Sequence, residues 1–423
     1  MNNPENAELL EKRLDDSIRR SRVSEATLRL RAGGKALAGR EVAVEQTAQG
    51  FRIGANWGNE TLALANDELS GLAKEQAERR SELFLGLFNQ VTLPFYWAGF
   101  EPERGKPRTE RLMKAARWYR DRGVAVKGHP LCWHTSTAPW LLDLDADGIL
   151  KEQKARIRRD VADFAGLIEA WDVVNEAVIM PVFDKYDNGI TRLCRKMGRI
   201  PLIRAMFEET RATNPKATLL LNDFDMSDAY DILVEGCLEA GIKIDAIGLQ
   251  SHMHQGYWGN AKTERIVERF ERFGLPLHFT ENSIVSGRLM PPEIVDLNDY
   301  KPIRWPSTRR GEARQEREVI LHYKTLLSRP AVQSITWWDL TDGAWLKAPS
   351  GLLRADQSPK PAYEALRKLV KEELWTKRAS LRTDAEGRVR FKGFLGDYRL
   401  EAEGKTLPFK LSKAGTEEIE LRL

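Results

Sequence analysis

Short apolar runs alternate with amphipathic segments along most of the chain. The apolar runs are 51-FRIGAN-56, 87-LFNQVTLP-94, 124-VAVKGHPL-131, 170-AWDVVNEA-177, 217-ATLLLND-223, 245-DAIGLQSH-252, 275-LPLHFTEN-282 and 334-SITWWDLTD-342. Segments between them, such as 312-EARQEREVILHYKTLLS-328, carry apolar residues at helical spacing. Strands that alternate with helices indicate parallel βα units, and eight such units over roughly 320 residues predict a (β/α)8 (TIM) barrel.

The competing fold is an open, doubly wound α/β sheet. Such a sheet usually carries a G-x-G-x-x-G turn after its first strand, and 54-GANWGNE-60 does not fit that pattern. The pattern therefore favours the barrel.

The two ends of the chain differ from the middle. Residues 27–48 read as two strands around a glycine-containing turn, and residues 377–423 contain four short alternating runs punctuated by glycines. Neither end is long enough to form a comfortable core alone. We predict that residues 1–50 (a helix and strands) and 375–423 pack together as one small β-sheet accessory module, with a catalytic barrel over 51–374.

Charge and composition exclude several classes of protein. The chain has 423 residues, 42% of them hydrophobic, and 66 basic against 62 acidic residues. The basic residues are scattered, so no nucleic acid partner is expected, and the absence of a long apolar run predicts no membrane span. Three widely spaced cysteines make no disulfide or metal pattern. The polar N-terminus fits a cytoplasmic protein, or a secreted or periplasmic one whose signal peptide was removed.

Polar and aromatic side chains gather at the C-terminal ends of seven of the eight predicted strands. They are Asn56 and Trp57; His129 with Trp133 and His134; Asn175 and Glu176; Asn222 and Asp223; Gln250, His252 and His254; Glu281 and Asn282; and Trp338, Asp339 and Asp342 with Trp345. Active sites of (β/α)8 barrels lie at this end of the strands. Because buried polar groups are costly unless paired, so many polar side chains at one end of the barrel predict an active site there.

These residue types suit glycoside hydrolysis. Two carboxyl groups that flank a glycosidic bond can protonate the leaving oxygen and attack the anomeric carbon or activate water. Amide side chains bind sugar hydroxyls as donors and acceptors, and indole faces match the apolar face of a sugar ring.

The pair His252 and His254 raises an alternative. Both lie on one face of the sixth strand and could bind a metal ion. However, the chain has only six histidines, and two of them fall inside a predicted strand and helix. We expect no metal centre, and His252 instead to hold a neighbouring carboxylate in position.

Five motifs in order resemble glycoside hydrolase family 10, the endo-β-1,4-xylanases. They are 128-GHPLCWH-134, 171-WDVVNEA-177, 246-AIGLQSHMH-254, 279-FTEN-282 and 335-ITWWDLTDGAW-345. The resemblance runs from about Phe51 to Leu366 and implies a (β/α)8 barrel that hydrolyses β-1,4-xylan with retention of configuration.

The resemblance also implies roles for individual residues. Glu176 matches the acid/base, Glu281 the nucleophile, Asn175 the residue that binds the sugar 2-hydroxyl, and His252 the imidazole on the nucleophile, with Gln250 beside it; His129, Trp133, Trp338 and Trp345 match donor-subsite contacts. As the acid, Glu176 must keep its proton near neutral pH. We therefore expect its apolar surroundings and its charged partner to raise its pKa.

Three features depart from the family. In 92-TLPFYWAGFEPE-103, Tyr96 stands where the family has a lysine, and an asparagine is missing. Ser283 occupies the position, two after the nucleophile, where the family commonly has an aspartate. Residues 286–311 form a long segment, which we expect to shape the substrate groove.

We therefore predict a retaining, endo-acting hydrolase of β-1,4-xylan that uses no cofactor and whose partner is a polysaccharide. The first alternative is the same mechanism on a decorated xylan or another β-linked polysaccharide, because the donor-subsite lysine and asparagine are missing. The remaining alternatives are a metal-dependent hydrolase and a non-catalytic sugar-binding protein.

Overall fold

The computed structural model describes residues 4–423 and divides the chain into two compact units. One unit contains Ile53–Gln315 and Ala331–Lys360. The other contains the chain through Arg52, Glu316–Pro330 and Pro361–Leu423. Both units are therefore assembled from segments that lie far apart in sequence.

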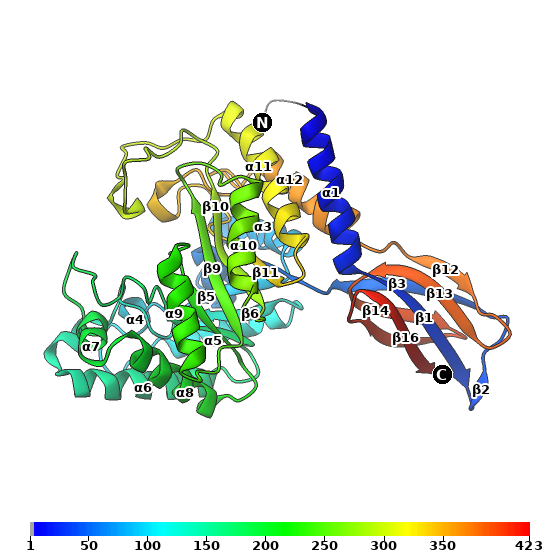
Figure 1. Ribbon diagram of the computed structural model, residues 1–423, viewed down its shortest axis with the longest axis horizontal. Helices are drawn as coiled ribbons and strands as arrows, with labels where there is room; N and C mark the ends of the chain where they lie inside the picture. Colours follow the sequence, from blue (N-terminus) through cyan, green and yellow to red (C-terminus); the bar gives the residue numbers. More distant parts are fainter. Residues whose placement is uncertain (1–3) are drawn as a thin grey trace. The chain divides into compact units, whose positions relative to one another are not determined.

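Eight parallel strands form a closed barrel, which confirms the predicted fold class (Figure 1). The strands are β4 (Arg52–Asn56), β5 (Gln90–Pro94), β6 (Ala125–His129), β7 (Ala170–Asn175), β8 (Thr218–Asp223), β9 (Ala246–Met253), β10 (Leu277–Ile284) and β11 (Val332–Trp337). Their order around the barrel is β10-β11-β4-β5-β6-β7-β8-β9. Strands covered on both faces read as continuous apolar runs, which explains why the sequence pattern marked them.

Helices lie between successive strands. They are α2 (Asn59–Ala65), α3 (Gly71–Leu87), α4 (Trp97–Phe100), α5 (Thr109–Arg120), α6 (Ala146–Asp163), α7 (Gly189–Met197), α8 (Arg199–Thr213), α9 (Asp228–Glu239), α10 (Asn260–Glu271) and α11 (Arg309–Leu327). Several begin at a side chain that caps the first turn. At α6, for example, the Asp145 carboxylate accepts a hydrogen bond of 2.8 Å from the Gly148 N–H.

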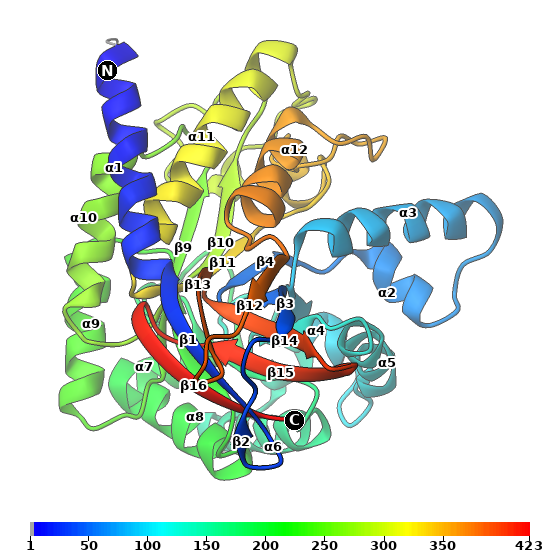
Figure 2. The same cartoon turned by 90° about the vertical axis from the view of Figure 1, so that its right-hand side faces the viewer.

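The remaining helices belong to the second unit. Helix α1 (Pro4–Arg22) runs beside the end of α11, where Ser17 Oγ donates to Ser328 O at 3.0 Å and Lys324 pairs with Asp15 at 2.9 Å (Figures 1 and 2). Helix α12 (Pro361–Lys368) continues into a π-helical turn over Leu369–Glu373.

The terminal strands form the small β-sheet module that the sequence predicts, and they divide into two four-stranded sheets. The first contains β1 (Val23–Ala32), β2 (Lys35–Ala36), β13 (Arg388–Phe394) and β16 (Gly415–Arg422), with β1 and β16 parallel (Figure 2). The second contains β3 (Glu41–Gln49), β12 (Ala379–Arg382), β14 (Gly396–Ala402) and β15 (Lys405–Leu411).

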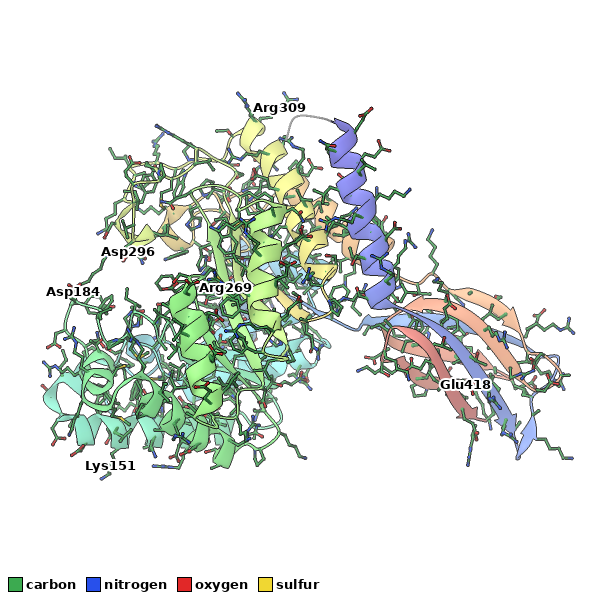
Figure 3. The ribbon with its side chains drawn as sticks, viewed as in Figure 1. Lys151, Asp184, Arg269, Asp296, Arg309 and Glu418 are labelled. Atoms are coloured by element: carbon green, nitrogen blue, oxygen red, sulfur yellow. The ribbon has the colours of Figure 1, made fainter. Side chains whose placement is uncertain are left out.

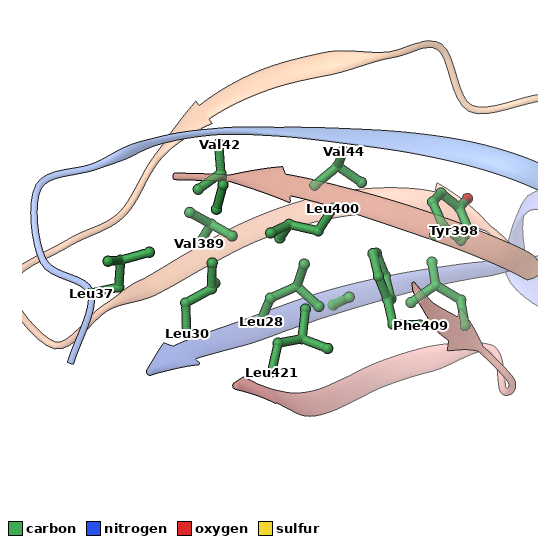
Figure 4. Close-up of a cluster of buried hydrophobic side chains, with 13 residues drawn as sticks. Leu28, Leu30, Leu37, Val42, Val44, Val389, Tyr398, Leu400, Phe409 and Leu421 are labelled. Carbon is green, nitrogen blue, oxygen red and sulfur yellow. The ribbon is translucent and has the colours of Figure 1, made fainter. Parts of the chain in front are cut away.

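A single hydrophobic cluster with residues from both sheets explains why the module has two layers. Leu28 and Leu30 on β1 pack in the same cluster as Val44 on β3 and Leu400 on β14 (Figure 4). Each strand alternates buried and exposed residues, so each sheet has a single apolar face that must be covered by another layer. The sequence pattern predicts this alternation but not the separation of the strands into two layers.

Candidate active site

The predicted site residues lie at the C-terminal ends of the barrel strands. His129 ends β6, Asn175 ends β7, and Glu176 and Trp338 directly follow β7 and β11. Gln250 and His252 lie in the C-terminal half of β9, and Glu281 lies in the C-terminal half of β10. The barrel closes all of these positions into one rim, as the pattern of polar strand ends predicted.

A chain of three buried amides connects the two glutamates. Gln250 Nε2 donates both to Glu176 Oε1 at 3.2 Å and to Asn175 Oδ1 at 3.2 Å. Asn222 Nδ2 donates to the same Asn175 oxygen at 2.8 Å and to Glu281 Oε1 at 3.0 Å. This amide chain (Gln250, Asn175 and Asn222) occupies the Asn175 oxygen twice, so the Asn175 amide nitrogen is the group that can serve a ligand hydroxyl.

Asn222 was noted in the sequence only as one polar strand end among several, yet it is the centre of this network. Its Oδ1 atom also accepts a hydrogen bond from Thr280 Oγ1 at 2.6 Å. Gly248 makes room for it, because a Cβ atom there would lie 2.3 Å from Asn222 Oδ1. The signal that could have distinguished Asn222 is this glycine on the neighbouring strand.

Glu176 has an unusual backbone and an unusual acidity. Its φ angle of 57° is in the left-handed region, which a non-glycine residue adopts at a cost of about 1–3 kcal/mol and which is concentrated at functional sites. The Glu176 N–H donates to Asn222 O at 2.8 Å and helps to hold this conformation. Burial and the nearby Glu281 charge raise the pKa of Glu176 to about 8, so its carboxyl is mainly protonated at neutral pH, as expected.

The position of Glu281 depends on a local irregularity in β10. The register against β9 shifts between Phe279 and Glu281, and such bulges commonly redirect side chains next to active sites. The side chain of Glu281 is 5% exposed. Its carboxylate accepts from Asn222 on one oxygen and lies 3.1 Å from His252 Nε2 on the other.

His129 is held from below by a buried ion pair. Its Nδ1 atom lies 2.7 Å from Asp172 Oδ2, which also pairs with Lys127 at 2.7 Å. Burial alone would raise the pKa of Asp172, but Lys127 and His129 outweigh burial and lower it. The ionised carboxylate therefore fixes the orientation of the His129 ring, whose Nε2 atom remains available to a ligand.

Four aromatic side chains form an aromatic wall (Trp57, Tyr96, Trp133 and Trp338) on the rim at β4, β5, β6 and β11. Tyr96 contacts Trp57 and Trp133 at ring distances of 5.5 Å each, and Trp57 contacts Trp338 at 6.1 Å. Trp133 Nε1 also donates to Glu176 Oε2 at 2.6 Å. The aromatic wall thus combines indole faces with a direct hydrogen bond to the Glu176 carboxyl group.

Two further tryptophans occupy different positions. The Trp345 ring lies 4.5 Å from the His252 ring, and its backbone N–H donates to Asp339 at 2.8 Å. The Trp140 ring packs against Trp97 at 5.5 Å, and its Nε1–H donates to Glu101 O.

The long segment after β10 reaches the loop after β7. Lys185 pairs with Asp296 at 2.5 Å and with Asp299 at 2.7 Å, and Figure 3 labels Asp184 and Asp296 on the two loops. Trp305 is buried within the segment and donates to Arg288 O at 2.7 Å. The loops that follow the strands of Glu176 and Glu281 are thus clasped together by a surface ion pair.

Between residues 4 and 423, no group of three or more His, Cys, Asp or Glu side chains is placed to hold a metal ion. Within the same range, no helix is long and apolar enough to cross a bilayer.

Comparisons with known proteins point in one direction. The model of "Glycosyl hydrolase family 10" matches residues 59–369. "Endo-1,4-beta-xylanase B" of Thermotoga neapolitana is 27% identical over 319 residues, which cover 70% of this chain and 85% of that protein. "Endo-1,4-beta-xylanase/feruloyl esterase" of Xylanibacter ruminicola is 27% identical over 305 residues, which cover 64% of this chain and 40% of that protein.

Solved structures show the same fold. Xylanase 10B from Thermotoga petrophila RKU-1, in complex with xylobiose, aligns with a TM-score of 0.62 and 22% identity, covering 78% of this chain and 98% of that one. The native xylanase 10B from Thermotoga maritima aligns with a TM-score of 0.61 and 22% identity, covering 77% and 96%.

Proposed function

The chain belongs to glycosyl hydrolase family 10, and from this premise we propose that it is a retaining, endo-acting hydrolase of β-1,4-xylan. Glu281 attacks the anomeric carbon, and Glu176 protonates the leaving oxygen and then activates the water that releases the sugar. Asn175 donates to the 2-hydroxyl of the sugar at the cleaved linkage. His129 and the tryptophans Trp133, Trp338 and Trp345 bind the donor part of the glycan.

The observation that carries this proposal is the different environment of the two carboxyl groups. Glu176 is held protonated by a pKa of about 8, as a general acid requires. Glu281 instead accepts hydrogen bonds from Asn222 and His252, as suits a carboxylate that attacks while ionised. Two carboxyl groups in such different surroundings, joined by the amide chain, match the needs of double displacement.

Tyr96 supports a second candidate within the same mechanism, namely a decorated xylan or another β-linked polysaccharide. The family places a lysine here, whose ammonium donates hydrogen bonds to a sugar, whereas Tyr96 offers a flat ring inside the aromatic wall. Such a surface favours stacking over ionic hydrogen bonding. The donor subsite would then accept a glycan with a different pattern of hydroxyl groups or substituents.

Release of reducing ends from plain xylan, glucuronoxylan, arabinoxylan and mixed-linkage glucan tests both candidates. Fast cleavage of plain xylan, with a β-anomer as the first product seen by NMR, supports the first. Cleavage of another glycan with plain xylan untouched supports the second, and Tyr96→Lys should then raise the relative rate on plain xylan, whereas Tyr96→Phe should not. No hydrolysis of any β-glycan would contradict both.

A further inference from the structure

A line of polar side chains leads from Glu281 through His252 and Ser283 to His254. His252 Nε2 lies 3.1 Å from Glu281 Oε2, and its Nδ1 atom lies 3.1 Å from Ser283 Oγ. Ser283 Oγ in turn lies 3.2 Å from His254 Nε2. The Nδ1 atom of His254 is buried without a hydrogen bond partner among residues 4–423. The two histidines that suggested a metal pair are therefore joined by a hydroxyl group.

Only one assignment of donors and acceptors along this line of hydrogen bonds is favourable. The Glu281 carboxylate only accepts, so His252 must carry a proton on Nε2. If His252 is neutral, its Nδ1 atom accepts from the Ser283 hydroxyl, and the serine oxygen accepts from His254 Nε2–H. The Nδ1 atom of His254 is then an unprotonated acceptor, the form in which the absence of a partner costs less than for a buried N–H.

The reverse direction is disfavoured. Protonation of His252 on Nδ1 would require Ser283 to accept from it and to donate to His254 Nε2. His254 would then carry its proton on Nδ1, where the structure provides no acceptor. A second proton on His254 is also disfavoured, because burial and the nearby His252 lower its pKa to about 3.

We propose that Ser283 and His254 are positioning residues that keep His252 neutral and aim its Nε2–H at Glu281. This inference rests on the proposed role of Glu281 as the nucleophile. A neutral donor orients the attacking carboxylate but withdraws less charge from it than an imidazolium would. Ser283 thus takes the place of the aspartate that is common in the family. A hydroxyl alone can donate or accept, and the hydrogen bond from His254 Nε2–H makes it donate to His252.

The carboxylate beside His252 would otherwise favour its protonated form. The titratable groups that face His252 are Glu281 on β10 and Asp339 after β11, with Glu176 joined to Glu281 through the amide chain. The Glu281 carboxylate, 3.1 Å from His252 Nε2, would favour an imidazolium through its charge. A neutral His252 in this setting needs the opposing bias that the hydroxyl group supplies.

His254 is fixed well enough to act in this way. Its ring contacts Trp345 at 5.2 Å and Trp305 at 5.8 Å, and its backbone oxygen accepts from the Met290 N–H at 2.9 Å. The segment after β10 therefore packs against the far end of the line. Trp305 of this segment contacts His254, the residue that fixes which way the Ser283 hydroxyl donates.

Titration of His252 by NMR of the ¹⁵N-labelled full-length protein tests the proposal without relying on turnover. In the wild type, His252 should remain a neutral Nε2–H tautomer through the pH range of activity. His254→Leu frees the Ser283 hydroxyl to accept, so His252 should become protonated about one to two pH units higher. Ser283→Asp should raise the midpoint further, because a carboxylate stabilises the imidazolium.

Kinetics provide the second measurement. The acidic limb of the kcat/KM profile should move upward with the His252 midpoint in both variants, while Leu9→Ala, at an exposed position, should leave it unchanged. An unaltered His252 titration in folded His254→Leu and Ser283→Asp would overturn the proposal. A shifted titration combined with normal turnover of Glu281→Ala would instead refute the role of Glu281 and leave the positioning device standing.

Discussion

The mouth of the barrel and the terminal β module bury their side chains equally well, but with opposite chemistry. At the mouth, Asn175 and Asn222 are 1% and 0% exposed, and both are held by hydrogen bonds. In the β module, Leu28 and Leu400 are also 0% exposed, and both belong to one hydrophobic cluster. Buried polar groups cost stability and provide reactivity, whereas buried leucines provide stability alone. Substitutions in the two regions should therefore separate activity from stability.

The largest expected effect is at Glu281. Glu281→Ala removes the attacking group and should reduce kcat by at least about 10³-fold, with little loss of thermal stability. Azide or formate can enter the vacated space and attack the sugar directly, so either anion should partly restore turnover and give a product of inverted configuration. Near-normal turnover of the variant without added anion would disprove the assignment.

Glu176 should produce a large effect that depends on the leaving group and on pH. Glu176→Ala removes the acid and should slow cleavage of glycan substrates by about 10²–10⁴-fold, but cost much less on aryl glycosides with good leaving groups. In the wild type, kcat/KM should fall as pH rises through about 8, because the acid loses its proton. An equal loss on good and poor leaving groups would contradict the role.

The same pKa predicts how Glu176 affects stability. Its folded value of about 8 lies above the ordinary 4.5, so the folded state binds more protons between these values and loses stability as pH rises across that window. Glu176→Gln replaces the acid with a neutral amide and should therefore raise the melting temperature more at pH 9 than at pH 5. An equal change at both pH values would show that the acid is not held protonated.

The contrasting effect belongs to the β module. Leu28→Ala leaves a cavity in the apolar cluster and should lower the free energy of unfolding of its unit by about 2–5 kcal/mol, as measured by chemical denaturation. Turnover per folded molecule should not change. Leu9→Ala, at an exposed helix position, is the matched control and should affect neither quantity. A loss of turnover in folded Leu28→Ala would give the module a role in catalysis.

The sequence was sufficient for the barrel and for the position of the site, for a physical reason. Barrel strands are covered on both faces and are therefore mostly apolar, so a polar residue such as Asn175 or Glu281 toward the C-terminal end of a strand is conspicuous. The links between those residues were not readable in the same way. The contact of Ser283 with both histidines depends on strand register, and β10 contains an irregularity that no pattern of hydrophobic residues announces. The division of the β module into two sheets could not be predicted, because alternation defines the faces of a strand but not its neighbours.

The three cysteines, finally, have a practical consequence. Cys132, Cys194 and Cys237 are all buried, and burial raises their thiol pKa values to about 12, 11 and 12. Alkylating dyes react with exposed thiolates, so the native chain should remain almost unlabelled at neutral pH. A cysteine introduced by Asp184→Cys, at an exposed position beside Lys185, would then be the single reactive position and would leave the Lys185 ion pairs in place. A fluorophore there would report, in real time, whether the loops that Lys185 joins to Asp296 separate when a glycan enters.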